Sequence, residues 1–123
     1  MVTKIQEIIP IEQWKMYTKI LNNNPNATDT IQWLWDYIES LSLEKQSKFI
    51  EFFSGSTCLP IGNLKQLSEN NRPFTIYIAN EVDKLPSATT CFYKVNLSLF
   101  TSKNILFEKF DIAISTFNGF QFM

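Results

Sequence analysis

The sequence predicts an α+β fold in which a helical hairpin is followed by a small β-sheet and a C-terminal helix. Two observations predict this class. Apolar residues before residue 55 recur at three- and four-residue spacing, which is typical of amphipathic helices. After residue 70 they gather in short β-branched and aromatic runs, which are typical of strands. With 123 residues, 45% of them hydrophobic, the chain can bury the core of one domain.

The helical hairpin is predicted from two apolar patterns that share a short connection. Thr28 or Asp29 is a natural N-cap for the first helix, and Ser42 for the second. Gly55 is a suitable C-terminal stop for the second helix. The apolar positions are Ile31, Leu34, Trp35, Ile38 and Leu41 in the first pattern and Leu43, Phe49, Ile50 and Phe53 in the second. Because the connection is short, we expect the two helices to form a hairpin.

The later elements follow from local composition. Residues 64–67 are compatible with one helical turn, and residues 74–78 are expected to form a strand opened by Pro73. A charged loop is expected over 80–86 and a second strand over 91–97. The last helix is expected to begin after Thr101 or Ser102. Its predicted buried positions are Ile105, Leu106, Phe110, Ile112 and Ile114.

Histidine is absent, and this excludes several chemistries. Neither a Ser-His-Asp nor a Cys-His hydrolase can be built within the chain without an imidazole base. The two cysteines, Cys58 and Cys91, cannot by themselves supply a tetrahedral zinc site. We therefore expect no metal and no cofactor. Free thiols are expected rather than a disulfide, because a chain with this many apolar residues does not need a covalent staple.

The charge pattern and hydropathy restrict the partners and the location. Eleven basic and twelve acidic residues give a net charge of −1, and Arg72 is the only arginine. We expect no nucleic-acid binding, because that function normally needs a basic face. No apolar run approaches the roughly 20 residues that span a bilayer, and the charged N-terminus does not resemble a secretory signal. We expect a monomeric protein in the cytoplasm or nucleus, without a membrane partner.

Cys91 is the strongest candidate for chemistry. It follows a loop that contains Pro86, Thr89 and Thr90. From the residues alone two interpretations stay open: a small core residue, or a nucleophile whose thiolate is stabilised by backbone amides.

Residues 85–92, Leu-Pro-Ser-Ala-Thr-Thr-Cys-Phe, resemble the active-site segment Leu-Pro-x-Ala-x-Thr-Cys-Phe of HECT-type ubiquitin ligases. Residues 31–36 resemble the family's Ile-x-Trp-Phe-Trp-Glu, and residues 49–56 its Phe-Leu-x-Phe-Val-Thr-Gly-Ser. Further matches occur in order at Leu59-Pro60, residues 72–76, the last helix and the Gly119-Phe120 ending. The resemblance implies a carboxy-terminal lobe over 29–123, an interlobe hinge over 22–28, and a remnant of the larger lobe, or an added extension, over 1–21.

This resemblance also implies a reaction. Cys91 would accept ubiquitin from a conjugating enzyme as a thioester and pass it to a substrate lysine. Such a site needs no histidine, because the incoming thioester is already activated. The amine must lose a proton, and Asp83 in the preceding loop is a candidate base. The other implied residues are Thr89, Thr90 and Phe92 as supports of the cysteine, Phe120 as a tail-docking residue, and Asn24, Pro25 and Asn26 as the hinge.

The sequence departs from the family pattern at several positions. Thr89 replaces a histidine, Tyr93 an asparagine and Cys58 an arginine, and residues 97–100 replace the family's Leu-Pro-x-Tyr. These departures leave open a second interpretation, a catalytically degenerate lobe that binds ubiquitin or another protein without turnover. An unrelated α+β interaction module is the third.

Overall fold

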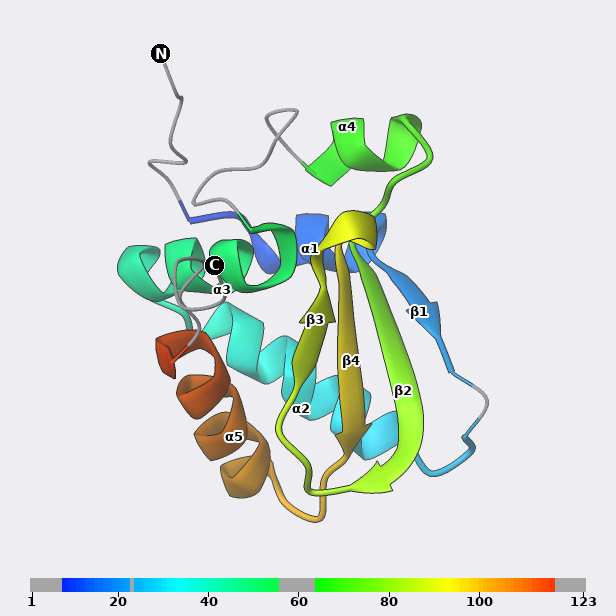
Figure 1. The fold of residues 1–123 in the computed structure, drawn as a ribbon, viewed down its shortest axis with the longest axis vertical. Coiled ribbons are helices and arrows are strands. Elements are labelled where there is room, and N and C mark those ends of the chain that lie inside the picture. The colour runs from blue at the N-terminus through cyan, green and yellow to red at the C-terminus, as the bar shows by residue number, and fades with distance from the viewer. Residues whose placement is uncertain (1–7, 23, 56–63, 117–123) are drawn as a thin grey trace.

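The computed structural model describes residues 8–22, 24–55 and 64–116, and its ribbon is shown in Figure 1. It confirms the α+β class. The elements in chain order are α1 (Ile11–Tyr17), β1 (Lys19–Leu21), α2 (Thr28–Glu39), α3 (Leu43–Ser54), α4 (Leu64–Glu69), β2 (Thr75–Val82), β3 (Ser87–Thr89), the 3₁₀ turn η1 (Thr90–Phe92), β4 (Lys94–Leu99) and α5 (Lys103–Thr116).

The four strands form one sheet in the order β1-β2-β4-β3. β1, β2 and β4 are parallel, whereas β3 runs antiparallel to β4. Side chains alternate between the two faces of a strand, and the buried face carries Ile76 and Ile78 of β2 and Val95 and Leu97 of β4. In Figure 1, α2 lies behind the sheet and α3 and α5 lie to one side, so the face turned to the viewer carries no described helix.

Two of the three expected caps of the helical hairpin are confirmed. The Ser42 hydroxyl accepts a hydrogen bond from the Lys45 backbone N–H at 3.2 Å, which starts α3. Gly55 ends α3 with φ 79°, a left-handed conformation that glycine adopts without a steric penalty. The expected cap of α2 was wrong: the N-cap is the buried Ala27, and Thr28 and Asp29 already lie inside the helix.

The segment before the hairpin contributes to the core, although its structure was not predicted. Trp14 of α1 is only 1% exposed. Its ring makes edge-on contacts with Phe49 and Phe53 of α3 and with Phe74, at centroid distances of 5.7, 6.2 and 5.4 Å. Such contacts add to the stabilisation from apolar burial. Thus α1 joins α3 to the residue that precedes β2.

The strand predictions were right in kind and wrong in extent. The first predicted strand, 74–78, is β2, which begins at Thr75 and continues to Val82 into the region expected to be a loop. The second, 91–97, is β4, which begins only at Lys94 because Tyr93 is in a left-handed conformation that interrupts extended backbone. β1 and β3 were not predicted. Each has three residues, too few to show a periodic pattern.

The last helix begins as expected, since the Ser102 hydroxyl accepts a hydrogen bond from the Ile105 N–H at 3.2 Å. Leu106, Phe110 and Ile114 are buried. The prediction for Ile112 was wrong: it is 41% exposed, because a residue two positions after Phe110 lies on the other side of a helix.

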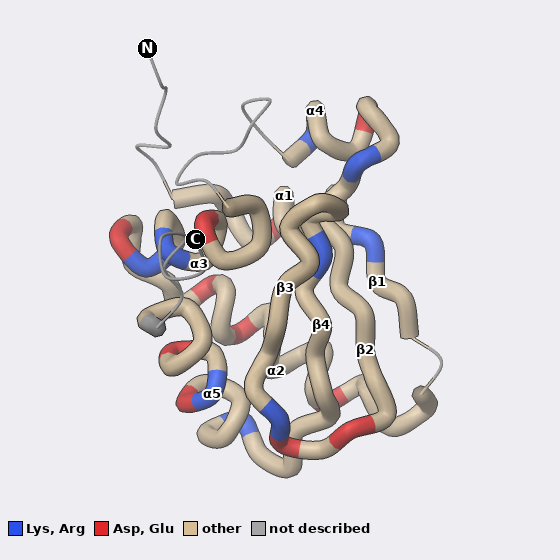
Figure 2. Tube along the Cα trace, in the orientation of Figure 1, with Lys and Arg blue, Asp and Glu red and all other residues tan. Residues whose placement is uncertain are grey.

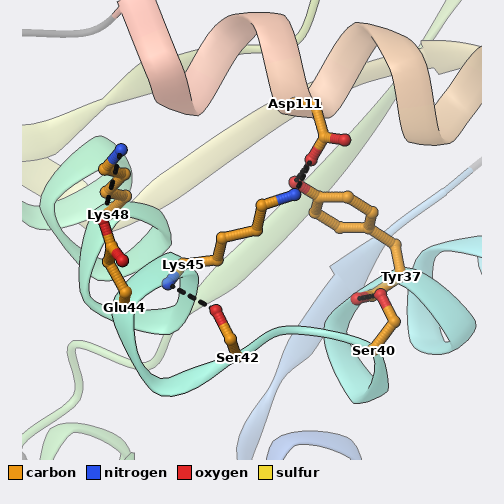
Figure 3. A network of polar contacts seen from close by, with 7 residues as sticks. All are labelled: Tyr37, Ser40, Ser42, Glu44, Lys45, Lys48 and Asp111. Atoms are coloured by element: carbon orange, nitrogen blue, oxygen red, sulfur yellow. Dashed lines mark hydrogen bonds and ion pairs between the residues drawn. The ribbon is translucent and has the colours of Figure 1, made fainter.

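A polar network connects the helical hairpin to α5 (Figure 3). The buried Tyr37 of α2 donates its hydroxyl proton to Asp111 Oδ1 of α5 at 2.9 Å, and Lys45 Nζ of α3 lies 3.3 Å from the same oxygen. Burial raises the pKa of Tyr37 above its usual value, and the hydrogen bond to Asp111 and the charge of that carboxylate raise it further. The neutral tyrosine is therefore the form that the fold stabilises.

This pKa shift predicts a loss of stability at alkaline pH. Above about pH 10, Tyr37 releases its proton in the unfolded chain but keeps it in the folded protein, so unfolding becomes easier. The contribution is fully present below pH 10 and decreases by about 1.4 kcal/mol per pH unit above it. Urea titrations at pH 8 to 11.5 should show this decline, and Tyr37→Phe should lessen it. Equal declines in both proteins would contradict the assignment.

Candidate functional site

Cys91 lies in η1, the turn that connects β3 to β4, and it is a free, exposed cysteine. In Figure 1 this turn stands at the upper end of both strands. The turn closes through a hydrogen bond from the Tyr93 N–H to the Thr90 carbonyl at 3.3 Å. Of the two interpretations left open by the residues, the core cysteine is therefore wrong, because Cys91 is at the surface.

The backbone around Cys91 is held from one side by Arg72. Its guanidinium donates a hydrogen bond to the Cys91 carbonyl oxygen and lies over the Tyr93 ring, 4.9 Å from the ring centroid. The Thr75 N–H donates to the Tyr93 carbonyl at 2.9 Å, which joins the turn to β2. The turn is thus held through its backbone carbonyls by Arg72 and Thr75, while the cysteine side chain stays accessible.

From the other side, the turn contacts the end of α3. A Cβ built on Gly55 would lie 3.9 Å from Thr90 Cβ, an ordinary van der Waals distance. The segment that resembles the family motif at 49–56 therefore meets the segment that contains the cysteine, although 35 residues separate Gly55 from Thr90 in the sequence. The sequence alone does not indicate this contact.

The other residues assigned to support the cysteine lie on the same turn or directly before it. Phe92 is 67% exposed beside Cys91. Thr89 is half-buried at the end of β3, where its hydroxyl accepts a hydrogen bond from Asn96 Nδ2 at 3.3 Å. Thr90 is also half-buried. Thr89, Thr90 and Phe92 are therefore brought together with Cys91.

Asp83, the candidate base, is not brought to Cys91. It follows β2 at the end of the sheet opposite to η1, where its N–H donates to the Leu99 carbonyl at 2.8 Å. The five residue steps along β4 from Lys94 to Leu99 correspond to roughly 17 Å. The two carboxylate oxygens of Asp83 accept hydrogen bonds from the Thr101 N–H at 2.9 Å and the Thr101 hydroxyl at 2.8 Å. This geometry supports a structural role for Asp83.

A structural Asp83 gives a specific prediction. Asp83→Gly removes both hydrogen bonds to Thr101. It adds no backbone strain, because glycine readily adopts the φ of 55° at this position. We expect the free energy of unfolding to fall by about 1–2 kcal/mol, because two hydrogen bonds to a charged acceptor are lost. The rate of transfer from Cys91 to free lysine should change less than about twofold, since roughly 17 Å excludes direct proton transfer. Urea unfolding and a single-turnover discharge assay measure the two quantities. A large loss of transfer in a stably folded variant would restore Asp83 as the base.

The three expected hinge residues form a turn between β1 and α2. The Asn26 N–H donates to Asn24 Oδ1 at 2.8 Å, and Asn24 Nδ2 donates to Asn80 Oδ1 of β2 at 2.8 Å. Pro25 is exposed between them. This geometry identifies a turn that is attached to the sheet, and the hinge and the division at residues 22–28 stay predictions.

Several sequence features lie outside the described residues: Phe120, Cys58 and the Leu59-Pro60 motif. Within the described ranges, no group of three or more Cys, Asp or Glu side chains is placed to hold a metal ion. None of the helices in the described part of the chain is long and apolar enough to cross a membrane.

A pocket that the sequence did not predict opens beside the cysteine turn. Its volume is about 240 Å³. Its lining comes from β1, the loop before β2, η1 and the starts of β2 and β4, and consists of Lys19, Leu21, Asn71, Arg72, Pro73, Thr75, Phe92 and Lys94. We call it the basic pocket. No sequence signal indicates it, because β1 was not predicted and Lys19 was assigned to a different lobe.

Comparisons with known proteins identify similar sequences. The family model described as HECT-domain (ubiquitin-transferase) matches residues 1–123. The chain is 37% identical over 114 residues to the E3 ubiquitin-protein ligase pub1 of Schizosaccharomyces pombe, which covers 91% of this chain and 15% of that protein. It is 31% identical to RSP5 of Saccharomyces cerevisiae and 29% identical to human NEDD4, again over 91% of this chain but over 14% and 9% of those ligases. The chain thus spans only about a seventh or less of the length of these relatives. A match of the family model to every residue shows that this chain belongs to the HECT-domain (ubiquitin-transferase) family.

Proposed function

We propose that this chain is a ubiquitin-transfer lobe in which Cys91 accepts ubiquitin as a thioester and passes it to a lysine of an acceptor protein. The exposed position of Cys91, on a turn that is bonded to Arg72 and lies beside Gly55, carries this proposal. Membership in the family supports the class of reaction. The conjugating enzyme and the acceptor protein are the partners that the proposal requires.

The first step exchanges one thioester for another. The Cys91 thiolate attacks the carbonyl carbon of the ubiquitin thioester on the conjugating enzyme, and a tetrahedral oxyanion forms. This intermediate collapses with loss of the conjugating enzyme's thiolate, so one C–S bond forms and one breaks. The exchange is nearly isoenergetic, and it needs accessibility more than a strong base. An exposed cysteine on a rigid turn meets this requirement.

In the second step, the neutral amine of a lysine attacks the Cys91 thioester. An amide C–N bond forms, the Cys91 thiolate leaves, and the amine proton passes to a base. We assign stabilisation of the oxyanion to backbone N–H groups of η1. Since Asp83 lies at the opposite end of the sheet, the base comes from the acceptor protein or from another part of the ligase.

Phe92, Thr89 and Thr90 complete the proposed site. An exposed phenylalanine adjacent to the nucleophile provides apolar surface for an incoming partner, whereas the two threonines connect the turn to β4 and α3. Movement about residues 24–26 and docking of the tail through Phe120 belong to the same proposal. They would bring Cys91 in turn to the conjugating enzyme and to the acceptor protein.

The test is transfer from a ubiquitin-charged conjugating enzyme to the 123-residue chain at high protein concentration. We expect a product with the mass of the chain plus one ubiquitin, which a reducing agent removes. The competing interpretation, a lobe that binds without turnover, is favoured by Tyr93, a bulky residue with φ 51° where the family has asparagine. Saturable binding of ubiquitin without any adduct would support that interpretation and contradict the proposal.

A further inference from the structure

The basic pocket adjoins the proposed nucleophile and is open to partners. Phe92, which forms one of its walls, is the residue directly after Cys91. The pocket lies at the η1 end of the sheet. Its lining residue Lys94 alternates along β4 with the core residue Val95, so the pocket is on the face opposite the core. A group bound there would therefore sit close to any amine that attacks a thioester at Cys91.

Strand register produces the positive charge of the pocket. Lys19 of β1 lies opposite Thr75 of β2, and Thr75 lies opposite Lys94 of β4. Residues in register across neighbouring strands point to the same face, so the two lysines share one row. Arg72, just before β2, adds the third cation.

The lining residues carry no negative charge. Three of the eight are Lys or Arg and none is Asp or Glu. Within the described part of the chain, Lys19, Arg72 and Lys94 form no ion pair; Arg72 and Lys94 instead lie over the rings of Tyr93 and Tyr77. Figure 2 shows a basic segment in each of β1, β4 and the loop after α4, while the loop at the opposite end of the sheet carries acidic residues and one basic segment. The chain as a whole has a net charge of −1, so this positive charge is local.

The pocket also has apolar walls. Leu21 and Phe92 are exposed, and Pro73 is a further apolar residue of the lining. A ligand that pairs with the cations and buries an apolar group would match this lining better than an inorganic anion, which has no apolar part.

We propose that the basic pocket binds an acidic segment of the acceptor protein, with one or two carboxylates and an apolar side chain, within a few residues of the target lysine. This inference rests on the proposed function, because the pocket would select which lysines react with the Cys91 thioester. The three cations of the pocket repel the ammonium group of a lysine that approaches Cys91 from this side. Neighbouring carboxylates offset that repulsion and orient the segment.

The small extent of the basic pocket decides against an extended polyanion. Single-stranded nucleic acid binds along a continuous basic groove with stacking surfaces for successive bases. Here the three cations line one pocket with a volume of about 240 Å³. A short carboxylate-bearing peptide is the occupant of the right size.

The test uses two acetylated, fluorescein-labelled peptides, Gly-Lys-Gly-Asp-Phe-Asp-Gly and its neutral twin with asparagine in place of each aspartate. We expect the 123-residue chain to bind the acidic peptide about five times more tightly at low salt, since each partly exposed ion pair contributes at most a few-fold. This preference should fall as salt is added. Lys19→Gln with Lys94→Gln should remove it. The matched control, Lys48→Gln with Lys84→Gln, makes the same charge change away from the pocket and should keep it.

A second measurement follows discharge of the Cys91 thioester to the same peptides. Acidic peptide should accept ubiquitin about five times faster than the neutral twin, and the pocket variant should lose this ratio while its rate with free lysine stays within about twofold. If no thioester forms, the proposed function fails, whereas peptide binding still tests the pocket. Equal binding of the two peptides, tighter binding of a ten-nucleotide oligothymidine than of the acidic peptide, or retention of the preference in the pocket variant would overturn the inference.

Discussion

Replacement of Cys91 by alanine is expected to abolish the ubiquitin adduct, with a loss of transfer of about 10⁴-fold or more, as for removal of other covalent nucleophiles. The physical reason is that the turn carries no other thiol. Cys91→Ser should give a slower reaction whose ester product survives a reducing agent, because the alcohol is a far weaker nucleophile at neutral pH than the thiolate. Non-reducing and reducing gels after reaction with a charged conjugating enzyme distinguish the three proteins.

The chain provides its own matched control for this experiment. Cys58→Ala removes the only other cysteine and should leave the adduct unchanged. Unfolding curves for Cys91→Ala should match those of the parent within about 0.5 kcal/mol, because the removed side chain is exposed. An adduct that survives Cys91→Ala and disappears with Cys58→Ala would contradict the assignment of the nucleophile.

The second large effect is expected at Trp14, in the core. Trp14→Ala should lower the free energy of unfolding by about 3–5 kcal/mol, because it empties a buried site between α1, α3 and the start of β2. A loss of this size is a large share of the 5–15 kcal/mol that typically stabilises a domain. Urea unfolding followed by far-ultraviolet circular dichroism measures it, and intrinsic fluorescence of the remaining tryptophans gives an independent signal.

Met16 is the matched control on the same helix. It is 69% exposed, so Met16→Ala should change stability by no more than about 0.5 kcal/mol. This pair also bears on the predicted boundary at residue 21. If residues 1–21 were only a remnant of another lobe with no part in the core, Trp14→Ala and Met16→Ala would have equally small effects.

The helical hairpin shows why part of the fold was predictable. Ser42 and Gly55 act through local geometry: a hydroxyl within reach of a free N–H, and a glycine free to adopt positive φ. Ala27 was missed as a cap because it has no side-chain acceptor and is stabilised by burial instead. Ile112 shows the same limit in the last helix, since hydrophobicity did not distinguish a buried position from one that faces solvent.

In the candidate site, too, only residues that are close in sequence were placed together correctly. Cys91, Thr89, Thr90 and Phe92 are neighbours in sequence, so a resemblance over eight residues placed them together. Asp83 is also near in sequence, yet a strand reversal separates it from Cys91 by the length of β4. Closeness in sequence did not indicate closeness in space there, because the extended segment that ends in β3 runs along the length of β4.

The sequence by itself determined the fold class, the helices α2 and α3 with two of their three expected caps, the family and the candidate cysteine, because each depends on residues that are close together along the chain. Only the tertiary structure decided that Arg72 holds the cysteine turn beside Gly55, that Trp14 completes the core, and that Lys19 and Lys94 share one pocket. These contacts join segments that are far apart in sequence. They depend on strand register and helix packing, which no local pattern specifies.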